Sequence, residues 1–347
     1  MALHPYKILI VAPSWVGDMV MAQPLFMRLH QLHPGLHLDV LAPAWTLPLL
    51  ARMAEVHEAI ANPFGHGEFK LSARYQLGKT LRQKQYDQAI VLPNSLKSAL
   101  VPFFAGIPRR TGYLGEMRWG LLNDARKLDK DELPLMVERF VALAERPGSP
   151  LPAPIPQPKL AIDEQQRLAT LIRLGLKPEP RIAALCVGAE YGPAKRWPAA
   201  HFAELGKLLR QEGYQVWLVG SAKDAEAGAE AAHLSAGACL DLCGKTSLNE
   251  AVDLLASASV IVSNDSGLMH VAAALGKPLV ALYGSSSPGF TPPLSHKARI
   301  LSLNLPCSPC FKRECPLGHL DCLMKLTPQR VLEQISTTIN EENHGSG

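Results

Sequence analysis

The sequence contains no uninterrupted apolar run of about 18 residues, so we expect no transmembrane helix. The N-terminal segment MALHPYKILIVAPSW has a short apolar stretch without a cleavage-site pattern, which predicts a first strand rather than a signal peptide. The formal net charge is only +4, too small to indicate nucleic-acid binding by itself. These absences predict a cytoplasmic location.

Three familiar nucleotide-binding motifs are also missing. The first predicted strand ends in Ala12–Asp18, where a dinucleotide fingerprint would need three glycines, and only Gly17 is present. Gly244-Lys245-Thr246 resembles the end of a P-loop, but the earlier glycine of that motif would fall at Cys239. Asp129-Lys130-Asp131 could hold a metal-bound nucleotide, but its charged surroundings indicate a solvated surface. NAD, FAD and a nucleotide-bound metal are therefore not expected.

Predicted strands and helices alternate along the chain, which favours parallel sheets in an α/β fold. A length of 347 residues, with 47% hydrophobic and 19% charged residues, fits about two globular domains. Residues 147–158 hold six prolines and predict a stiff connector, because proline continues neither a helix nor a central strand. We predict two Rossmann-like, doubly wound domains, with an N-terminal domain over 1–150, a linker with a connecting helix over 151–175, a C-terminal domain over 176–325, and a helix with a disordered tail over 326–347.

Hydrophobic periodicity gives the approximate bounds of the elements. In the N-terminal domain we predict strands over 7–13, 37–43 and 87–93 and helices over 18–33, 45–53, 71–84 and 95–104. In the C-terminal domain we predict strands over 181–189, 214–221, 258–262 and 278–284 and helices over 198–212, 247–256 and 268–275.

The most informative segment runs from Ser263 to His270, between a short apolar strand and an alanine-rich helix. It places polar residues at the carboxyl end of a strand where a helix begins, and free amides at a helix N-terminus bind anions. In a strand–turn–helix–strand unit, this edge of the sheet commonly holds the ligand. The alternative is an ordinary helix cap, for which Asn, Asp and Ser are also the usual residues.

A second loop with ligand-binding character, Gly188–Pro198, follows the first strand of the C-terminal domain. Lys195 can place a point charge on a phosphate, and Arg196 can bond a carboxylate or phosphate through two N–H groups. The loop therefore suits a negatively charged ligand, although a solvated basic loop would have the same composition.

Two features of the N-terminal domain suggest a reactive group and a binding surface. Asp18, at the start of a predicted helix, is either a general base or a favourable partner of the helix dipole. Residues 94–119 interleave cations with aromatic residues, which suits a phosphorylated, partly apolar partner such as nucleic acid or a lipid headgroup at a membrane. The same aromatic side chains could equally belong to the core. The residues concerned are Lys97, Arg109, Arg110, Arg118, Phe103, Phe104, Tyr113 and Trp119.

Seven cysteines are present, and four of them form the cluster Cys307-x2-Cys310-x4-Cys315-x6-Cys322. In a reducing compartment this cluster suggests a structural zinc site, and the alternatives are free thiols or a redox-dependent bridge. The remaining cysteines lie in or beside apolar segments, where we expect buried thiols: Cys186, Cys239 and Cys243.

Four blocks of the sequence, taken together and in this order, resemble the ADP-heptose glycosyltransferases of glycosyltransferase family nine. They are PSWVGDMVMAQPL from residue 13, PNSLKSALVPFFAGIPRRTGYLGEMRWGLLND from residue 93, GAEYGPAKRWP from residue 188, and SNDSGLMHVAAALGKPLVALYGSSSPGFTPPLSHKAR from residue 263. The resemblance covers nearly the whole chain. It implies a GT-B fold, in which two Rossmann-like domains face each other across a cleft, with the acceptor bound mainly by the first and ADP-heptose mainly by the second.

The resemblance also implies an inverting transfer of L-glycero-D-manno-heptose from ADP-heptose onto the first heptose of the lipopolysaccharide inner core. The acceptor would be heptosyl-Kdo2-lipid A, reached by peripheral contact with the cytoplasmic face of the inner membrane. Neither nucleic acid nor a required cofactor is expected. The alternatives are transfer to another core position and a non-catalytic nucleotide-sugar-binding protein of the same fold.

Individual roles follow from the matched blocks. Asp18 matches the family's proposed catalytic base, and Lys195 matches the lysine near the donor diphosphate, where it would offset the charge of the leaving ADP. The expected donor-binding residues are Gly188, Lys195, Arg196, Asp265, Ser266, Gly267 and His270, with Asp224 or Glu226 meeting the ribose. The expected acceptor-binding residues are Ser14, Trp15, Gly17, Asn94, Lys97, Arg109, Arg110 and Arg118.

Overall fold

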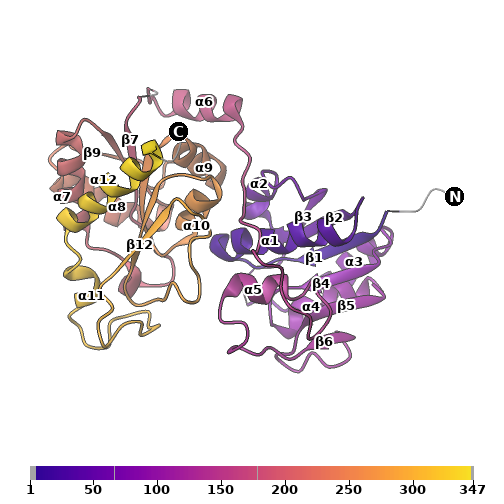
Figure 1. The fold of residues 1–347 in the computed structure, drawn as a ribbon. Coiled ribbons are helices and arrows are strands. Elements are labelled where there is room, and N and C mark those ends of the chain that lie inside the picture. The colour runs from indigo at the N-terminus through magenta and orange to yellow at the C-terminus, as the bar shows by residue number, and fades with distance from the viewer. Residues whose placement is uncertain (1–4, 66, 178, 345–347) are drawn as a thin grey trace. The chain divides into compact units, whose positions relative to one another are not determined.

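The computed structural model describes residues 5–65, 67–177 and 179–344 of the chain. The chain divides into two compact units, Met1–Pro158 and Lys159–Gly347, each with its own sheet (Figure 1). The division falls at the end of the proline-rich segment, whose prolines have no N–H to tie the backbone to a neighbouring element.

The connecting helix α6 (Glu164–Arg173) belongs to the second unit. It packs against α9 (Leu248–Ser257), and the hydroxyl of Thr170 donates to Oδ2 of Asp253 at 2.7 Å between these helices. Both side chains are buried, so this bond fixes α6 to the second unit.

The first unit contains a six-stranded parallel sheet with the order β3-β2-β1-β4-β5-β6. Its central strand β1 is apolar after Lys7, and Ile8, Leu9 and Ile10 are completely buried, as expected for a strand covered on both faces. The strands are β1 (Lys7–Val11), β2 (His37–Pro43), β3 (Glu58–Asn62), β4 (Gln88–Val91), β5 (Arg109–Tyr113) and β6 (Asp124–Arg126).

Helices of the first unit form two groups, because α1 packs with α5 and α3 packs with α4. Right-handed crossovers on either side of β1 place these groups on opposite faces of the sheet. The helices are α1 (Val16–Leu32), η1 (Ala44–Thr46), α2 (Leu47–Leu50), α3 (Leu71–Arg82), α4 (Leu96–Phe104) and α5 (Met136–Val141).

The second unit repeats this topology, with the strand order β12-β11-β10-β7-β8-β9, again all parallel. In both sheets the chain starts at a central strand, adds strands on one side, and then continues on the other. The switch points therefore lie between β1 and β4 and between β7 and β10, where ligands of such sheets usually bind. The strands are β7 (Ile182–Cys186), β8 (Gln215–Val219), β9 (Cys239–Asp241), β10 (Val260–Asn264), β11 (Leu279–Tyr283) and β12 (Ala298–Ser302).

Helices also cover both faces of the second sheet, with α7, α8 and α12 on one side and α9 and α10 on the other (Figure 1). Trp197 is buried in this unit and its indole N–H donates to the carbonyl oxygen of Leu326 at 2.8 Å. The helices are η2 (Pro193–Lys195), α7 (Ala199–Gln211), η3 (Ala222–Asp224), α8 (Ala225–Leu234), α10 (Gly267–Ala274), α11 (Asp321–Met324) and α12 (Pro328–His344), together with α6 and α9.

The predicted elements are confirmed with bounds shifted by a few residues, and the differences have local causes. α1 begins at Val16, so Asp18 lies in its first turn rather than at its start. Residues 341–344 continue α12, although disorder was expected there, and residues 345–347 lie outside the described residues. No helix formed by the described residues is both long and apolar enough to cross a membrane. The elements that were not predicted are β3, β5, β6, β9, β12, α5, α8, α11, η2 and η3.

Candidate active site

One buried amide side chain joins the loops at the switch point of the second sheet. Asn264, the last residue of β10, donates from Nδ2 to the carbonyl oxygen of Val187 at 2.9 Å and accepts the backbone N–H of Trp197 at 3.0 Å. Asn264 is fully buried, so water does not compete for these bonds. The end of β10 is thereby fixed to both ends of residues 187–198, the loop between β7 and α7, here called the Lys195 loop.

The Lys195 loop carries a cation that is paired with Asp265. Nζ of Lys195 lies 2.5 Å from Oδ2 of Asp265, whose side chain is only 4% exposed. The ammonium also lies 5.2 Å from the ring centroid of Tyr191. A buried carboxylate is costly unless it is paired, so Asp265 holds the lysine charge at the switch point.

Helix α10 begins next to this ion pair, and the side chain of its N-cap residue makes no capping hydrogen bond. Ser266 is the N-cap residue, yet its hydroxyl makes no capping bond and instead lies 3.3 Å from Oγ of Ser263. By contrast, Ser247 caps α9 by accepting the N–H of Glu250. An uncapped N-terminus presents N–H groups and a positive dipole end, and both favour phosphate. The interpretation of this segment as a mere helix cap therefore does not fit.

His270, one turn into α10, contributes no charge near pH 7. The imidazole is only 4% exposed. Burial lowers its pKa to about 4, while nearby Asp265 acts to raise the pKa and Lys195 acts to lower it. A neutral imidazole can donate one hydrogen bond and accept another, which suits a ligand hydroxyl or phosphate oxygen.

Asp224, rather than Glu226, lies at this edge of the sheet. The Asp224 carboxylate accepts the N–H and hydroxyl of Ser221 at 2.9 and 2.7 Å, and Oδ1 lies 3.9 Å from Nη2 of Arg196. A Cβ added to Gly188 would lie 2.5 Å from Cγ of Asp224, so only glycine permits this approach. Glu226 is exposed on α8, away from these contacts.

Two further hydroxyls at this edge were missed in the sequence. Ser285 and Ser286 follow β11, the neighbour of β10, and both are buried. Neither hydroxyl has a hydrogen-bond partner among the described residues, and an unpartnered buried hydroxyl is unfavourable unless a ligand or water bonds it. A serine run directly after an apolar parallel strand is the signal that could have found them.

The switch point of the first sheet gathers the predicted reactive group and part of the predicted acceptor site. The turn after β1 leads into α1, whose N-cap residue Trp15 makes no side-chain capping bond. β4 pairs with β1, so the turn after β4 lies at the same edge. Asp18 is partly buried in the first turn of α1. The predicted residues in these two turns, and in the first turns of the helices that follow them, are Ser14, Trp15, Gly17, Asp18, Asn94 and Lys97.

Arg109 and Arg110 do not join this site. Both begin β5, so they lie at the opposite, amino edge of the parallel sheet. Nη2 of Arg109 bonds Asp124 at 2.9 Å, and Arg110 donates to the carbonyl oxygens of Leu121 and Ile107, each at 2.6 Å. Their expected place in the acceptor site is corrected accordingly.

Arg118 is also corrected, from a binding residue to a positioning residue. It is completely buried and donates to the carbonyl oxygen of Pro93 at 2.6 Å, to Oδ1 of Asn94 at 3.3 Å and to the carbonyl oxygen of Tyr113. Burial lowers its pKa, against the opposing charge of Glu116. Arg118 thus holds the turn after β4 in place and does not face an acceptor.

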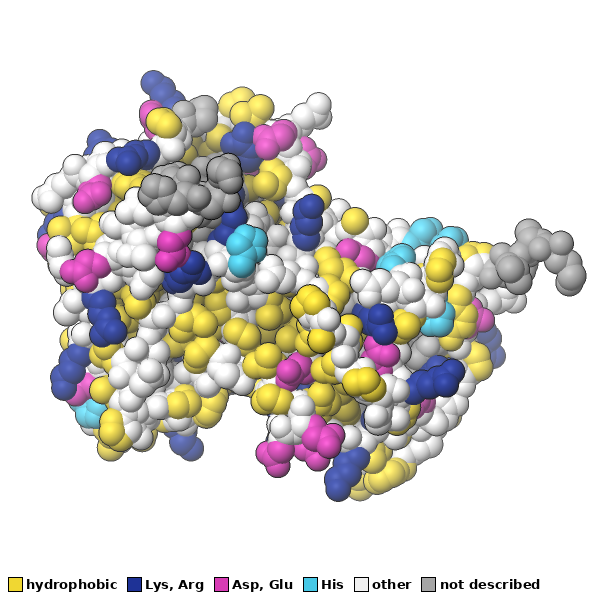
Figure 2. Space-filling view, viewed as in Figure 1, with side chains coloured by type: hydrophobic (Ala, Val, Ile, Leu, Met, Phe, Trp, Pro, Cys, Tyr) yellow, Lys and Arg dark blue, Asp and Glu magenta, His cyan; other side chains and the backbone are white. Residues whose placement is uncertain are grey.

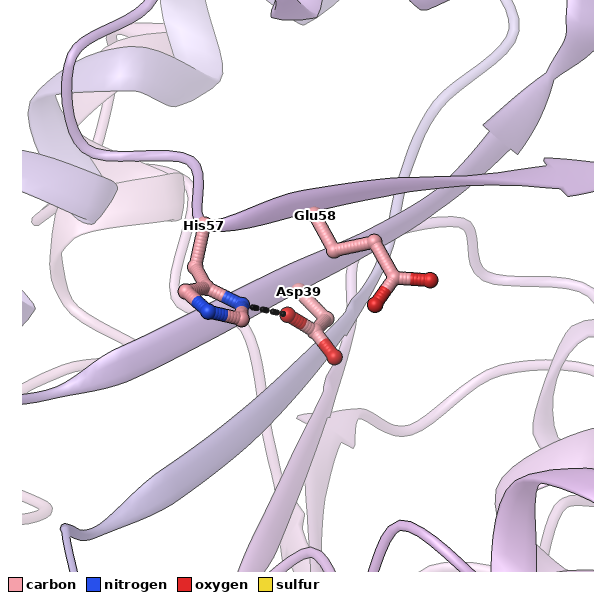
Figure 3. A group of neighbouring side chains, drawn as sticks. All are labelled: Asp39, His57 and Glu58. Carbon is pink, nitrogen blue, oxygen red and sulfur yellow. Dashed lines mark hydrogen bonds and ion pairs between the residues drawn. The ribbon is translucent and has the colours of Figure 1, made fainter.

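A carboxylate–histidine cluster in the first unit has metal-ligand spacing, but a lysine ammonium already pairs with its carboxylates. Among the described residues, Asp39, His57 and Glu58 alone form a group of three whose ligand atoms lie within 4.8 Å of one another (Figure 3). The Lys84 ammonium pairs with Glu58 and lies 3.6 Å from Asp39, which also accepts the Tyr86 hydroxyl at 2.6 Å. Figure 2 shows histidines exposed on this unit. We interpret the cluster as an ion-pair network.

The three cysteines outside the cluster are buried, as expected. Cys186, Cys239 and Cys243 are buried thiols, which confirms that prediction. Of the four clustered cysteines, Cys322 is buried and Cys307 is exposed, with the other two between these extremes.

Two doubly wound parallel sheets, with polar turns at both switch points and no dinucleotide glycine fingerprint, match the GT-B fold of glycosyltransferases. A sequence model described as Glycosyltransferase family 9 (heptosyltransferase) matches residues 74–321. The chain belongs to this family.

Individual relatives agree with the family. Lipopolysaccharide heptosyltransferase 2 of Escherichia coli (strain K12) is 54% identical, over 97% of this chain and 99% of its own length. Lipooligosaccharide heptosyltransferase 2 of Haemophilus influenzae is 49% identical, over 95% of this chain and 98% of its own length. The solved structure of E. coli ADP-heptose lipopolysaccharide heptosyltransferase II aligns with a TM-score of 0.87 and 51% identity, covering 97% of this chain and 99% of that one.

We predict that His270 makes stability depend on pH. Since its pKa is about 4 in the folded protein and 6.5 ordinarily, the unfolded chain binds more protons between these values. The free energy of unfolding of wild type, relative to His270→Gln, should therefore fall as pH drops through this window, by up to about 3 kcal/mol. Urea unfolding at several pH values measures this free energy, and His233→Gln, at an exposed position, is the control. A difference that does not change with pH would contradict a buried, neutral imidazole.

Proposed function

We propose that this protein is an inverting glycosyltransferase that moves L-glycero-D-manno-heptose from ADP-heptose to the first heptose of the lipopolysaccharide inner core. The observation that carries the proposal is the Lys195–Asp265 ion pair beside the uncapped N-terminus of α10. This arrangement suits a diphosphate attached to a sugar, because it offers a cation, backbone N–H groups and a carboxylate at one place. The names of the relatives supply the sugar and the acceptor class.

The donor would use each polar group of the second switch point. Lys195 and the first amides of α10 bond the diphosphate and stabilise its charge as it leaves. The second oxygen of Asp265 accepts a heptose hydroxyl, which explains a carboxylate beside an anion site. Asp224 meets the ribose, because it lies at the sheet edge and Glu226 does not.

The acceptor, heptosyl-Kdo2-lipid A, would bind to the first unit. Large apolar side chains stand exposed in the turns after β1, β2 and β5, at the edge that also carries Asp18: Trp15, Trp45, Met117 and Trp119 are 45%, 51%, 80% and 70% exposed. Tryptophan in such positions favours the interface of a bilayer. We propose peripheral contact of this edge with the cytoplasmic face of the inner membrane, since the acceptor is anchored there.

In the proposed reaction, the acceptor hydroxyl oxygen attacks the anomeric carbon of the donor heptose. The Asp18 carboxylate accepts the hydroxyl proton, a glycosidic bond forms, and the bond from the anomeric carbon to the phosphate oxygen breaks. ADP leaves with the bonding electron pair from the face opposite to attack, so the configuration inverts. Lys195 and the α10 amides offset the charge on ADP, so the reaction requires no cofactor.

The proposed function predicts that ADP release requires a heptose-bearing acceptor. Purified protein with ADP-heptose should release ADP with heptosyl-Kdo2-lipid A and not with Kdo2-lipid A, because the attacking hydroxyl belongs to the first heptose. A coupled ADP assay and mass spectrometry of the lipid measure this. Equal release with Kdo2-lipid A would assign transfer to another core position, and no release with either acceptor would favour a binding protein.

Replacing Asp18 should strongly reduce turnover without abolishing donor binding. Asp18→Asn keeps the size of the side chain but removes its basicity, so kcat should fall about 10²- to 10⁴-fold. ADP-heptose affinity, measured by calorimetry, should stay close to wild type. Asp129→Asn, at an exposed position, is the matched control and should change neither value. Lost donor binding with near-normal turnover at saturation would exclude Asp18 as the base.

A further inference from the structure

The segment from 303 to 320, between β12 and α11, has neither helix nor strand, although it lies within a compact unit (Figure 1). Loops of this length are uncommon in compact domains and are usually functional or held by another constraint. Its three cysteines and Cys322 of α11 line one cavity of about 20 Å³, enough for an ion or a water molecule. Ala194 of the Lys195 loop and Ser285 form part of the same wall.

We propose that Cys307, Cys310, Cys315 and Cys322 bind one zinc ion, and that the closed cysteine loop (residues 303–320) holds the Lys195 loop in the conformation that binds the donor diphosphate. The metal site does not depend on the proposed function, whereas its effect on the donor rests on that function.

Four thiolates are a donor set that zinc prefers in structural sites. Cys322 provides a fixed ligand, because it is buried in the hydrophobic core of the second unit. Cys315, in the middle of the segment, lines the same cavity as Cys322.

His319 also lines the cavity but is not placed as a ligand. Its Nδ1 accepts the backbone N–H of Asp321 at 2.9 Å, so the proton of the neutral ring sits on Nε2. With Nδ1 bonded and Nε2 protonated, the imidazole has no lone pair for a metal. The donor set is therefore the four sulfurs.

Zinc binding must draw the cysteine loop inward. A Zn–S distance of about 2.3 Å places tetrahedral sulfurs about 3.8 Å apart. All four cysteines are among the described residues, and no three of their sulfurs lie within 4.8 Å of one another. Because the loop has no ladder of backbone hydrogen bonds to break, it can make this movement, and it would carry its contacts with the Lys195 loop along.

Those contacts join the two loops directly. The carbonyl oxygen of Arg313 accepts the N–H of Ala194 at 3.0 Å, and that of Phe311 accepts the hydroxyl of Tyr191 at 2.9 Å. The Arg313 guanidinium lies 5.4 Å from the Tyr191 ring centroid. A Cβ on Gly192 would lie 2.5 Å from the oxygen of Arg313, so the approach requires glycine there. Ala194 directly precedes Lys195, and the cysteine loop therefore sets the position of that lysine.

Metal content tests the site. The full chain, reduced, stripped of metal and incubated with Zn²⁺, should retain one zinc per chain, and all four clustered thiols should become protected from a thiol reagent. Cys307→Ser/Cys310→Ser should retain none, and Cys239→Ser, at a buried cysteine on β9, should retain one. Failure of wild type to retain zinc, or a disulfide within the cluster under these conditions, would overturn the metal site.

ADP binding tests the coupling. Removing zinc should weaken ADP binding about 10-fold, within the range that couplings between sites commonly span. Gly192→Ala should separate the two loops, keeping zinc but weakening ADP binding to a similar extent. If the protein retains zinc but its ADP affinity does not change when the zinc is removed, the coupling is overturned. Zinc-loaded wild type that binds no ADP would contradict the proposed function and leave the metal site standing.

Discussion

The 2.5 Å contact between Lys195 and Asp265 is the interaction on which the donor site depends. Both partners lie at the switch point of the second sheet, and a buried carboxylate is stable there only while it is paired. The pair fixes the Lys195 loop against the end of β10, next to the bonds that Asn264 makes to the same loop. The start of α10 lies beside this pair. Its N-cap side chain makes no capping bond, so the first N–H groups of the helix are available to a ligand.

The two units use one topology for two kinds of chemistry. Each sheet has the same strand order around its first strand, and each begins a helix directly after a polar turn at its switch point. In the second unit the turn offers a cation and open amides, which stabilise negative charge. In the first unit the first turn of α1, directly after β1, offers the Asp18 carboxylate, which can accept a proton. A glycosyl transfer needs both functions, one for the leaving diphosphate and one for the attacking hydroxyl.

The sequence predicted the elements with strong apolar periodicity and the residues at their carboxyl ends. It failed where a strand is short or polar, as in β5 (RRTGY), and so assigned Arg109 and Arg110 to the acceptor site. Knowledge of β5 would have put both at the amino edge. Arg118 was misjudged because composition does not reveal that backbone carbonyls surround a guanidinium. The contacts between the Lys195 loop and the cysteine loop join segments that are distant in sequence, so no local sequence pattern predicts them.

The central claim is that the Lys195–Asp265 pair and the start of α10 bind the donor diphosphate. A crystal structure of the protein with ADP tests it most directly. The account predicts phosphate oxygens within about 3 Å of Nζ of Lys195 and of the backbone nitrogens that begin α10, with Asp265 still beside the lysine. A diphosphate bound elsewhere, with no contact to Lys195 or to α10, would contradict it.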